Sequence, residues 1–225
     1  MKAVQTDFLG DPNIGLFMKA SDRLLLTGCQ MEDKKLRQAE EALGVKAVRT
    51  GIVNSEVVGI FCAMNSNGVL LPNIALDSEV AAIKKATKEM GMNVEVLDSN
   101  FTAIGNVILC NDKGAVLSRV LTRRDMKVVE GCLGVECDYE TVAGLESVGS
   151  CGIATNRGCI LHRDASEEEL DTIQDILKVD TDIGTANFGS PFIGSCAIAN
   201  GNGVVAGIST TGFEITRIME SLKLI

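Results

Sequence analysis

A glycine that recurs five times at nearly equal spacing constrains the fold of this chain more than any other feature. The intervals between successive copies are 44, 46, 44 and 45 residues. In four copies a second glycine follows nine positions later, after a short polar stretch. Such self-similarity at a fixed period is typical of repeat architectures. The first glycines of the five units are Gly15, Gly59, Gly105, Gly149 and Gly194.

Each glycine opens a stretch that predicts a β-hairpin. Residues 148–161 show the pattern best, because one apolar run leads to a polar turn ending at Gly158 and a second apolar run leads away. The first copy, residues 14–26, lacks the turn glycine and is one residue shorter in its turn, yet it belongs to the series by spacing. The equivalent stretches in the other units are 58–71, 104–117 and 193–206.

A helix and a short return strand are expected after each hairpin. The last three helices begin with capping boxes, at Thr122–Asp125, Ser166–Glu169 and Thr211–Glu214. Asp77 or Ser78 is expected to cap the second helix. Glycines end the first three helices, at Gly44, Gly91 and Gly134. The clearest return strands are residues 45–50 and 94–97.

The fifth unit has no return strand of its own, since the sequence ends at Ile225 just after its helix. Residues 2–6 nearly repeat residues 46–50, and both stretches begin thirteen residues before a first glycine. We therefore expect an α/β (α+β) fold: a closed five-bladed β/α-propeller with pseudo-fivefold symmetry, in which the N-terminal strand completes the last blade. We also expect residues 1–225 to form a single domain. An open solenoid would leave residues 2–7 without a partner.

Composition limits the class of protein. Hydrophobic residues make up 46% of the chain, enough for one substantial core or two small ones. Residues 1–7 contain no apolar leader segment, and no apolar run reaches membrane-spanning length, so a cytoplasmic protein is expected. Most of the eight cysteines lie in apolar runs, which indicates buried free thiols rather than disulfides.

The formal charge of −9 argues against binding to nucleic acid chiefly through phosphates and favours a basic protein partner. Two segments depart from the average. Residues 164–182 carry eight acids and one lysine, whereas residues 113–127 carry five bases and one acid. Each segment is compatible with a solvated helix surface or with a partner site.

Residues suited to catalysis are scarce. His162 is the single histidine, and Cys132 and Cys137 have no second cysteine pair at metal-site spacing. Residues 201–207 imitate a phosphate-binding loop, but their place in the repeat predicts a hairpin turn. We therefore expect no catalytic residue, no metal site and no cofactor, although His162 could meet a cysteine in space.

Five such repeats resemble the pentein fold, which guanidine-modifying enzymes share with translation initiation factor 6. The matching residues run in order from about residue 3 to residue 222 and resemble the initiation factor 6 family, in the archaeal form by length and by the end at Ile225. They are residues 70–73, 103–107, 110–112, 148–150, 156–158, 161–162 and 184–190.

The resemblance implies a non-enzymatic factor that binds the large ribosomal subunit, blocks premature joining of the small subunit by steric occlusion, and accompanies late subunit maturation. It implies contact with a ribosomal protein beside the sarcin–ricin loop and limited contact with ribosomal RNA. No DNA or membrane partner is implied. Because the chain has no tryptophan and one tyrosine, interface anchors are few and a monomer is expected.

Asn106 coincides with the subunit-facing asparagine of the family, directly after a first glycine. The residues directly after the first glycines of neighbouring units should lie on the same side of the ring. Ile60 differs from the basic residue that eukaryotic members often carry there, which puts a charge contact in doubt. The candidate partner-binding residues are Asn106, Ile60, Ser150, Cys151, Phe188 and Phe192.

The alternative is a guanidine-modifying enzyme, an amidinotransferase or a deiminase, with the same fold. Such an enzyme needs a late nucleophilic cysteine, a histidine and carboxylates that bind the guanidinium group. Cys196 lies in the last unit but lacks the adjacent histidine, and His162 has no evident acid partner in its motif.

Overall fold

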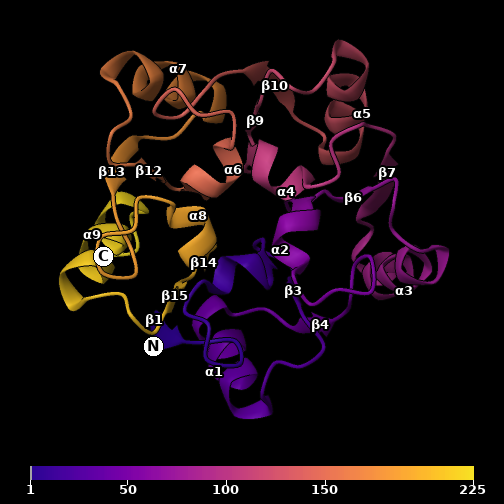
Figure 1. Cartoon of the computed structure of the whole chain (residues 1–225), viewed down its shortest axis with the longest axis horizontal. Coiled ribbons are helices and arrows are strands. Elements are labelled where there is room, and N and C mark those ends of the chain that lie inside the picture. Colours follow the sequence, from indigo (N-terminus) through magenta and orange to yellow (C-terminus); the bar gives the residue numbers. More distant parts are fainter. Residues whose placement is uncertain (1) are drawn as a thin grey trace.

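The computed structural model describes residues 2–225, and in this range it is a mixed α/β structure with five three-stranded sheets, nine α-helices and two 3-10 helices. Figure 1 shows the sheets arranged around one axis, with short helices near the centre and long helices at the periphery. Over the described range no sheet closes on itself, so the architecture is five separate small sheets.

Every sheet has an inner, a middle and an outer strand. The inner and middle strands pair antiparallel and form the expected hairpin, whereas the middle and outer strands pair parallel. The inner strands are β2 (Met18–Ala20), β5 (Ala63–Met64), β8 (Ile108–Cys110), β11 (Gly152–Ala154) and β14 (Ala197–Ala199). The middle strands are β3 (Leu25–Thr27), β6 (Gly68–Pro72), β9 (Gly114–Leu117), β12 (Cys159–His162) and β15 (Val204–Gly207). The outer strands are β4 (Ala47–Arg49), β7 (Asn93–Leu97), β10 (Glu136–Tyr139), β13 (Thr181–Gly184) and β1 (Ala3–Thr6).

The pairing of the N-terminal strand confirms that it completes the last unit. β1 lies parallel to β15, with Ala3 opposite Val204 and Thr6 opposite Gly207. The Lys2 ammonium also donates to the carbonyl of Leu224 at 2.8 Å. The two ends of the chain are therefore held in the same unit, as Figure 1 shows.

A long helix follows each hairpin, as the repeat predicts. These helices are α1 (Asp33–Leu43), α3 (Asp77–Thr87), α5 (Arg123–Leu133), α7 (Glu167–Leu177) and α9 (Gly212–Ser221); the 3-10 helix η2 (Lys88–Met90) extends α3. The three capping boxes are confirmed. So are the left-handed glycines Gly44, Gly91 and Gly134.

The expected cap of α3 is wrong. The helix already includes Asp77 and Ser78, and its N-cap is Leu76. Glu79 replaces a polar cap, because its Oε2 accepts a hydrogen bond from the Leu76 amide at 2.9 Å. The N-cap position therefore needs no polar side chain of its own.

The hairpins begin later than the sequence pattern suggests. The apolar run around each first glycine opens with one helical turn instead of strand. These turns are the 3-10 helix η1 (Ile14–Leu16) and the short helices α2 (Val58–Phe61), α4 (Ile104–Val107), α6 (Val148–Cys151) and α8 (Ile193–Cys196). Four apolar residues with one glycine do not distinguish a buried helical turn from a buried strand by periodicity.

The short helices meet around the axis through their glycines. A Cβ atom on any first glycine would lie between 1.9 and 2.2 Å from the carbonyl oxygen of the first glycine in the preceding unit. The series is cyclic, since Gly15 lies against Gly194 in the same way that Gly59 lies against Gly15. Only glycine permits backbones to approach this closely.

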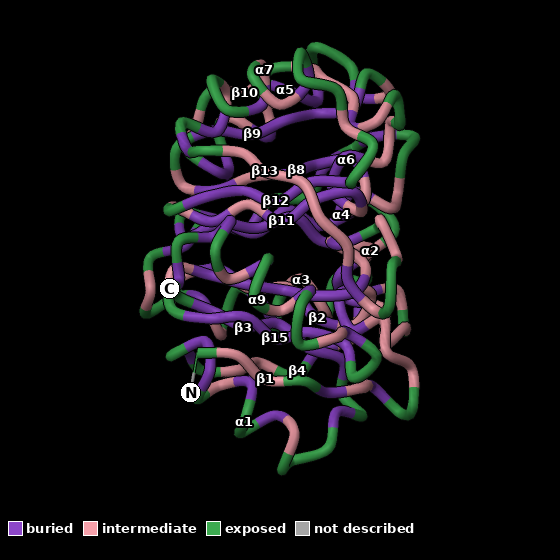
Figure 2. Tube along the Cα trace, turned by 90° about the vertical axis from the view of Figure 1, so that its left-hand side faces the viewer, coloured by how far each residue is buried: buried purple, intermediate pink, exposed green. Residues whose placement is uncertain are grey.

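The hydrophobic core is divided among the junctions between units. Five clusters of buried side chains each combine residues from two neighbouring units, including one cluster between the fifth unit and the first. Figure 2 shows the buried strands in the interior and the exposed residues at the rim and turns. The hydrophobic content therefore builds five shared clusters instead of one or two cores.

Polar side chains in the hairpin turns join neighbouring units. Asn65 donates its amide to the carbonyls of Asn111 and Leu133, and Asn111 and Asn200 make the equivalent pairs of bonds to the units that follow them. In the other two turns an arginine reaches across instead, with Arg23 donating to the Ser66 carbonyl and Arg157 to the Gly201 carbonyl. Every pair of adjacent turns is thus hydrogen-bonded.

The glycine contacts generate a stability prediction. Gly149→Ala should lower the free energy of unfolding by more than about 3 kcal/mol, because neither backbone can move without disturbing the next unit. The control is Gly131→Ala in α5, where an added Cβ meets nothing within 4 Å and should stabilise the helix by about 0.5–1 kcal/mol. Urea unfolding followed by circular dichroism measures both. Equal stability of the two variants would show that the close contacts among the first glycines are not required for stability.

Candidate partner-binding face

The short helices η1, α2, α4, α6 and α8 contact one another in a cycle, and Figure 2 shows α2, α4 and α6 along one side of the molecule. We call this side the short-helix face. The structure brings Ile60, Asn106 and Ser150 together on it, because α2 contacts α4 and α4 contacts α6. All three residues are half-buried, and each directly follows a ring glycine. Leu16 and Ser195 occupy the same slot in the first and fifth units.

Cys151 is misplaced in the set of candidate contacts. Its side chain is fully buried in the cluster between the third and fourth units, and its thiol lies 3.7 Å from the Ser147 hydroxyl. In the helical turn α6 successive side chains point about 100° apart, so Cys151 faces the core while Ser150 is half-buried. The side chain of Cys151 therefore cannot touch a partner.

Phe188 and Phe192 lie on the loop that leads into α8. Phe188 is 82% exposed and Phe192 is 40% exposed. The ring of Phe192 packs edge-on against His162, with 5.5 Å between the ring centroids. This contact holds Phe192 in place and buries the histidine, whose Nδ1 accepts the amide N–H of Asp164 at 3.2 Å.

Tight loops with left-handed residues precede four of the short helices. Two backbone hydrogen bonds close each of them, between Phe8 and Asp11, Ile52 and Ser55, Val142 and Leu145, and Ala186 and Ser190. The central residues have positive φ, which is uncommon for side chains other than glycine, asparagine and aspartate. The non-glycine residues in this conformation are Leu9, Val53, Asn54, Ala143, Asn187 and Phe188.

A carboxylate from the following long helix holds three of these loops. Glu79 accepts the amides of Val53 and Asn54, Glu169 those of Ala143 and Gly144, and Glu214 those of Phe188 and Gly189. The same carboxylates accept the N-cap amides of their helices. One glutamate thus fixes both a helix start and a loop of the short-helix face.

The carboxyl groups of Glu169 and Glu214 have lowered pKa values. Burial raises the pKa of Glu169 and Glu214, but the hydrogen bonds outweigh burial and leave both pKa values below the ordinary range of glutamate. The donors to Glu169 include Gly144, Ser166 and Thr141; those to Glu214 include Thr211, Gly189 and Thr185. Hydrogen bonds to the charged form favour that form.

Sequence reasoning missed three apolar side chains of this region. Phe213 is 83% exposed at the start of α9, and Leu9 and Ile208 are also exposed. Phe213 directly precedes Glu214, which holds the loop of Phe188. The helical pattern could have predicted the exposure of Phe213, because this position does not lie on the buried side of α9 with Ile218.

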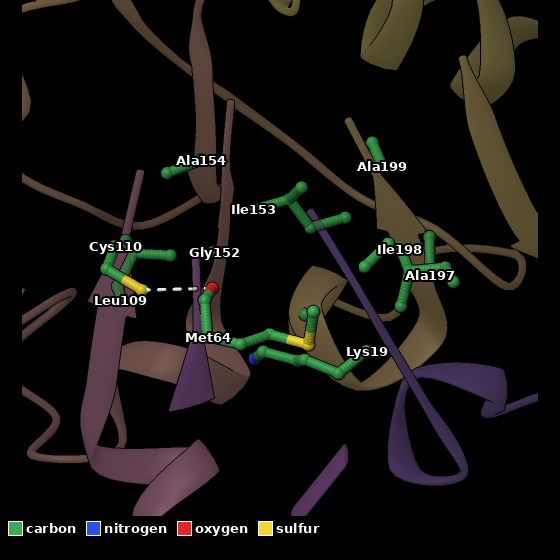
Figure 3. A pocket seen from close by; sticks show the side chains of 12 residues that line it. Lys19, Met64, Leu109, Cys110, Gly152, Ile153, Ala154, Ala197, Ile198 and Ala199 are labelled. Carbon is green, nitrogen blue, oxygen red and sulfur yellow. Dashed lines mark hydrogen bonds between the residues drawn. The ribbon is translucent and has the colours of Figure 1, made fainter. Parts of the chain in front are cut away.

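The central cavity on the axis is small. Figure 3 shows its lining, which includes Lys19, Met64, Cys110, Ile153 and Ile198 from the inner strands. Its volume of about 40 Å³ holds about three water molecules and is far below the roughly 300–1,000 Å³ of small-molecule sites. Cys110 donates its thiol to the Met64 carbonyl, and burial raises the pKa of the thiol to about 11.

The cysteine and histidine geometry does not favour nucleophilic catalysis. Burial raises the pKa of Cys196, and its thiol donates to Asn13 Oδ1 at 3.5 Å. A reactive cysteine needs a lowered pKa. Among the described residues no group of three or more histidine, cysteine, aspartate or glutamate side chains could hold a metal ion. All eight cysteines are free.

Both charged segments are partly neutralised by intramolecular contacts. In the acidic segment Asp182 pairs with Arg217 and Asp180 with Lys223, whereas Lys178, the single base of the segment, pairs with Glu136 outside it. In the basic segment Arg123 lies over the ring of Tyr139, and Arg119 lies 3.5 Å from Glu140. Within residues 2–225 no helix has the length and apolar character to cross a membrane.

Comparison with known proteins gives a match over nearly the whole chain. The model of the eIF-6 family matches residues 3–221. The chain is 40% identical to translation initiation factor 6 of Pyrococcus horikoshii over an alignment of 227 residues, which covers 100% of both chains. It is 42% identical to the Thermococcus onnurineus protein of the same name, covering 99% of this chain and 98% of the relative. A solved agmatine deiminase of C. jejuni aligns with 57% of this chain and 50% of its own, at 10% identity and a TM-score of 0.38, too low to bear on fold or activity.

The lowered carboxyl pKa values predict the acid sensitivity of the short-helix face. Because the folded pKa lies below the unfolded value, these groups stabilise the protein above about pH 4.3, and the contribution is lost as pH falls through the folded pKa. Glu169→Gln and Glu214→Gln should each flatten the fall in the free energy of unfolding between about pH 5 and pH 3. Urea unfolding at a series of pH values measures this, with the exposed Glu168→Gln as control. If the free energy of unfolding of these variants fell with pH in parallel with that of the wild type, the stabilising role of the two ionised carboxyl groups would be contradicted.

Proposed function

Because this chain belongs to the eIF-6 family of non-enzymatic translation initiation factors, we propose that it binds the large ribosomal subunit and sterically blocks joining of the small subunit. The observation that carries the proposal is the agreement with initiation factor 6 proteins at about 40% identity over the full length of both chains. A role in late maturation of the large subunit is part of the same proposal. Steric occlusion requires a rigid surface and no catalytic group.

We propose that the short-helix face binds the subunit. Its contacts would be Ile60, Asn106 and Ser150 near the axis, with Phe188 and Phe192 farther out. The contacts among the five first glycines support this choice, because they fix the relative positions of the residues that directly follow each glycine. A preorganised surface loses little conformational freedom on binding.

The partner proposed on the subunit is a ribosomal protein beside the sarcin–ricin loop, with limited contact to ribosomal RNA. The net charge of −9 supports a basic protein partner over a phosphate-dominated interface. We propose that the factor acts as a monomer in the cytoplasm, where ribosomal subunits join. The guanidine-modifying alternative has no support from the cysteine and histidine geometry.

We further propose that the five sheets are the blades of one closed ring and that residues 1–225 form one domain. The cyclic glycine contacts, the five shared core clusters and the pairing of β1 with β15 support this arrangement. Because each cluster joins two units, no unit has a core of its own.

A subunit-joining assay tests the proposed function. Purified protein should pellet with isolated large subunits and not with small subunits, and it should reduce the formation of joined ribosomes when added at saturation. Unchanged subunit joining at saturating protein would overturn the proposal.

Asn106→Asp should weaken binding to large subunits about tenfold or more, because it removes the hydrogen-bond donors of the amide and puts a charge that must be desolvated at the centre of the proposed interface. Gln38→Glu on the outer face of α1 adds the same charge away from this face and should bind like wild type. Apparent dissociation constants from pelleting, with thermal unfolding as a folding check, measure the difference. If a folded Asn106→Asp protein bound with wild-type affinity, Asn106 would not be part of the interface.

The single-domain proposal predicts one cooperative transition. Tyr139 in β10 is the only tyrosine and the chain has no tryptophan, so tyrosine fluorescence reports on the third unit alone. Far-ultraviolet circular dichroism reports on all units. The two probes should give the same urea midpoint. Separate midpoints would show that units unfold independently.

A further inference from the structure

The two most exposed aromatic side chains belong to one hydrogen-bonded assembly. Phe188 is 82% exposed and Phe213 is 83% exposed. The Phe188 amide donates to Glu214 Oε2 at 3.2 Å, and Phe213 is the residue before Glu214. The same carboxylate therefore fixes the backbones that carry both rings. Large exposed apolar groups that gather in one place mark interaction sites.

The backbone that carries Phe188 is strained. Asn187 has a φ of +47° and Phe188 a φ of +63°, a left-handed conformation that costs a bulky residue about 1–2 kcal/mol. Such conformations persist only where the surroundings impose them, and they cluster at binding sites. A glycine at position 188 would remove this cost, so the phenylalanine ring itself is retained at the expense of stability.

Hydrogen bonds on both sides impose this conformation. Glu214 accepts the Gly189 amide at 2.8 Å and the Thr185 hydroxyl at 2.8 Å. The Asn187 side chain donates to the Pro12 carbonyl at 2.8 Å, and its backbone amide donates to the Thr210 hydroxyl at 3.1 Å. The loop is thus tied to α9, to the segment before it and to the first unit. Phe188 is held outward without a contact that would bury it.

The charges of the segments that carry the two rings disfavour a phosphate-rich partner. Residues 3–14 and 183–216 contain three acids, Asp7, Asp11 and Glu214, and no lysine or arginine. Lys35 neutralises Asp7 at 2.9 Å, which leaves two negative charges. Stacking of nucleic-acid bases on aromatic rings normally needs a positively charged groove for the backbone. The surroundings favour a neutral or basic protein surface.

We propose that Phe188 and Phe213 form an aromatic anchor that inserts into an apolar pocket, bordered by basic side chains, on a protein of the large subunit. This inference rests on the proposed function and names the chemistry of one contact. Glu214 is the positioning residue of the anchor. Leu9 and Ile208 are also exposed, at 64% and 57%. Aromatic anchors of this kind carry most of the binding energy of many interfaces.

Pelleting titrations with purified large subunits test the anchor. Phe188→Ala and Phe213→Ala should each raise the apparent dissociation constant about tenfold or more, and Phe188→Leu should restore most of the affinity of Phe188→Ala. The matched control is Val96→Ala on the outer strand β7, another exposed apolar side chain, which should bind like wild type. Wild-type affinity of both alanine variants would overturn the anchor while the proposed function stands. Failure of the wild-type protein to pellet would overturn the proposed function itself.

A double-mutant cycle tests the positioning role. Glu214→Gln should weaken binding, and adding Glu214→Gln to the variant that already carries Phe188→Ala and Phe213→Ala should weaken binding no further, because the carboxylate acts through the two rings. Additive losses in the cycle would overturn the role of Glu214. Wild-type protein is also titrated with protein-free large-subunit RNA. Binding to this RNA that Phe188→Ala abolishes would place the ring on bases and overturn the protein pocket.

Discussion

The structure depends on the close approach of five glycine backbones around one axis. Each first glycine lies against the carbonyl of the preceding one, and the series returns from Gly194 to Gly15. These contacts set the distance between neighbouring units, and the core clusters at the junctions then bury the side chains between them. A side chain at one glycine would displace two units at once.

The second glycine, which four of the five hairpins have, serves a different contact. A Cβ at Gly114 would lie 1.9 Å from the carbonyl of Ile176 near the end of α7, and one at Gly158 would lie 2.1 Å from that of Ser221 at the end of α9. These glycines let the helix of the next unit pack on the hairpin turn. The turn asparagines add hydrogen bonds at the same helix ends, as when Asn111 donates to the Leu177 carbonyl. The first glycines therefore fix the inner part of every junction, and the second glycines fix the outer part of four of the five.

The short-helix face combines this rigid centre with rigid loops at its edge. Glu79, Glu169 and Glu214 each satisfy amides of a helix start and of a left-handed loop. A surface that is ordered before binding suits a factor that acts by occlusion. The units differ in the polarity of the side chains that they present on this face. The third and fourth units present the polar residues Asn106 and Ser150, and the fifth unit presents exposed phenylalanines.

The amino-acid sequence was enough to predict the number of units, the hairpin–helix order and the helix caps at Thr122, Ser166 and Thr211, because repeat spacing and capping depend on residues close together in the chain. It also predicted that residues 3–6 return to the last sheet, from their likeness to residues 46–50. It also placed Asn106 and Phe188 among the candidate contacts. The fold was needed to show that the glycine runs are helical turns and that Phe213 is exposed while Glu214 next to it holds the loop of Phe188. It also removed Cys151 from the candidate contacts, in agreement with the buried thiols that the apolar runs predict. Those outcomes depend on which backbones meet across a junction, and contacts between distant residues leave no local periodicity to detect.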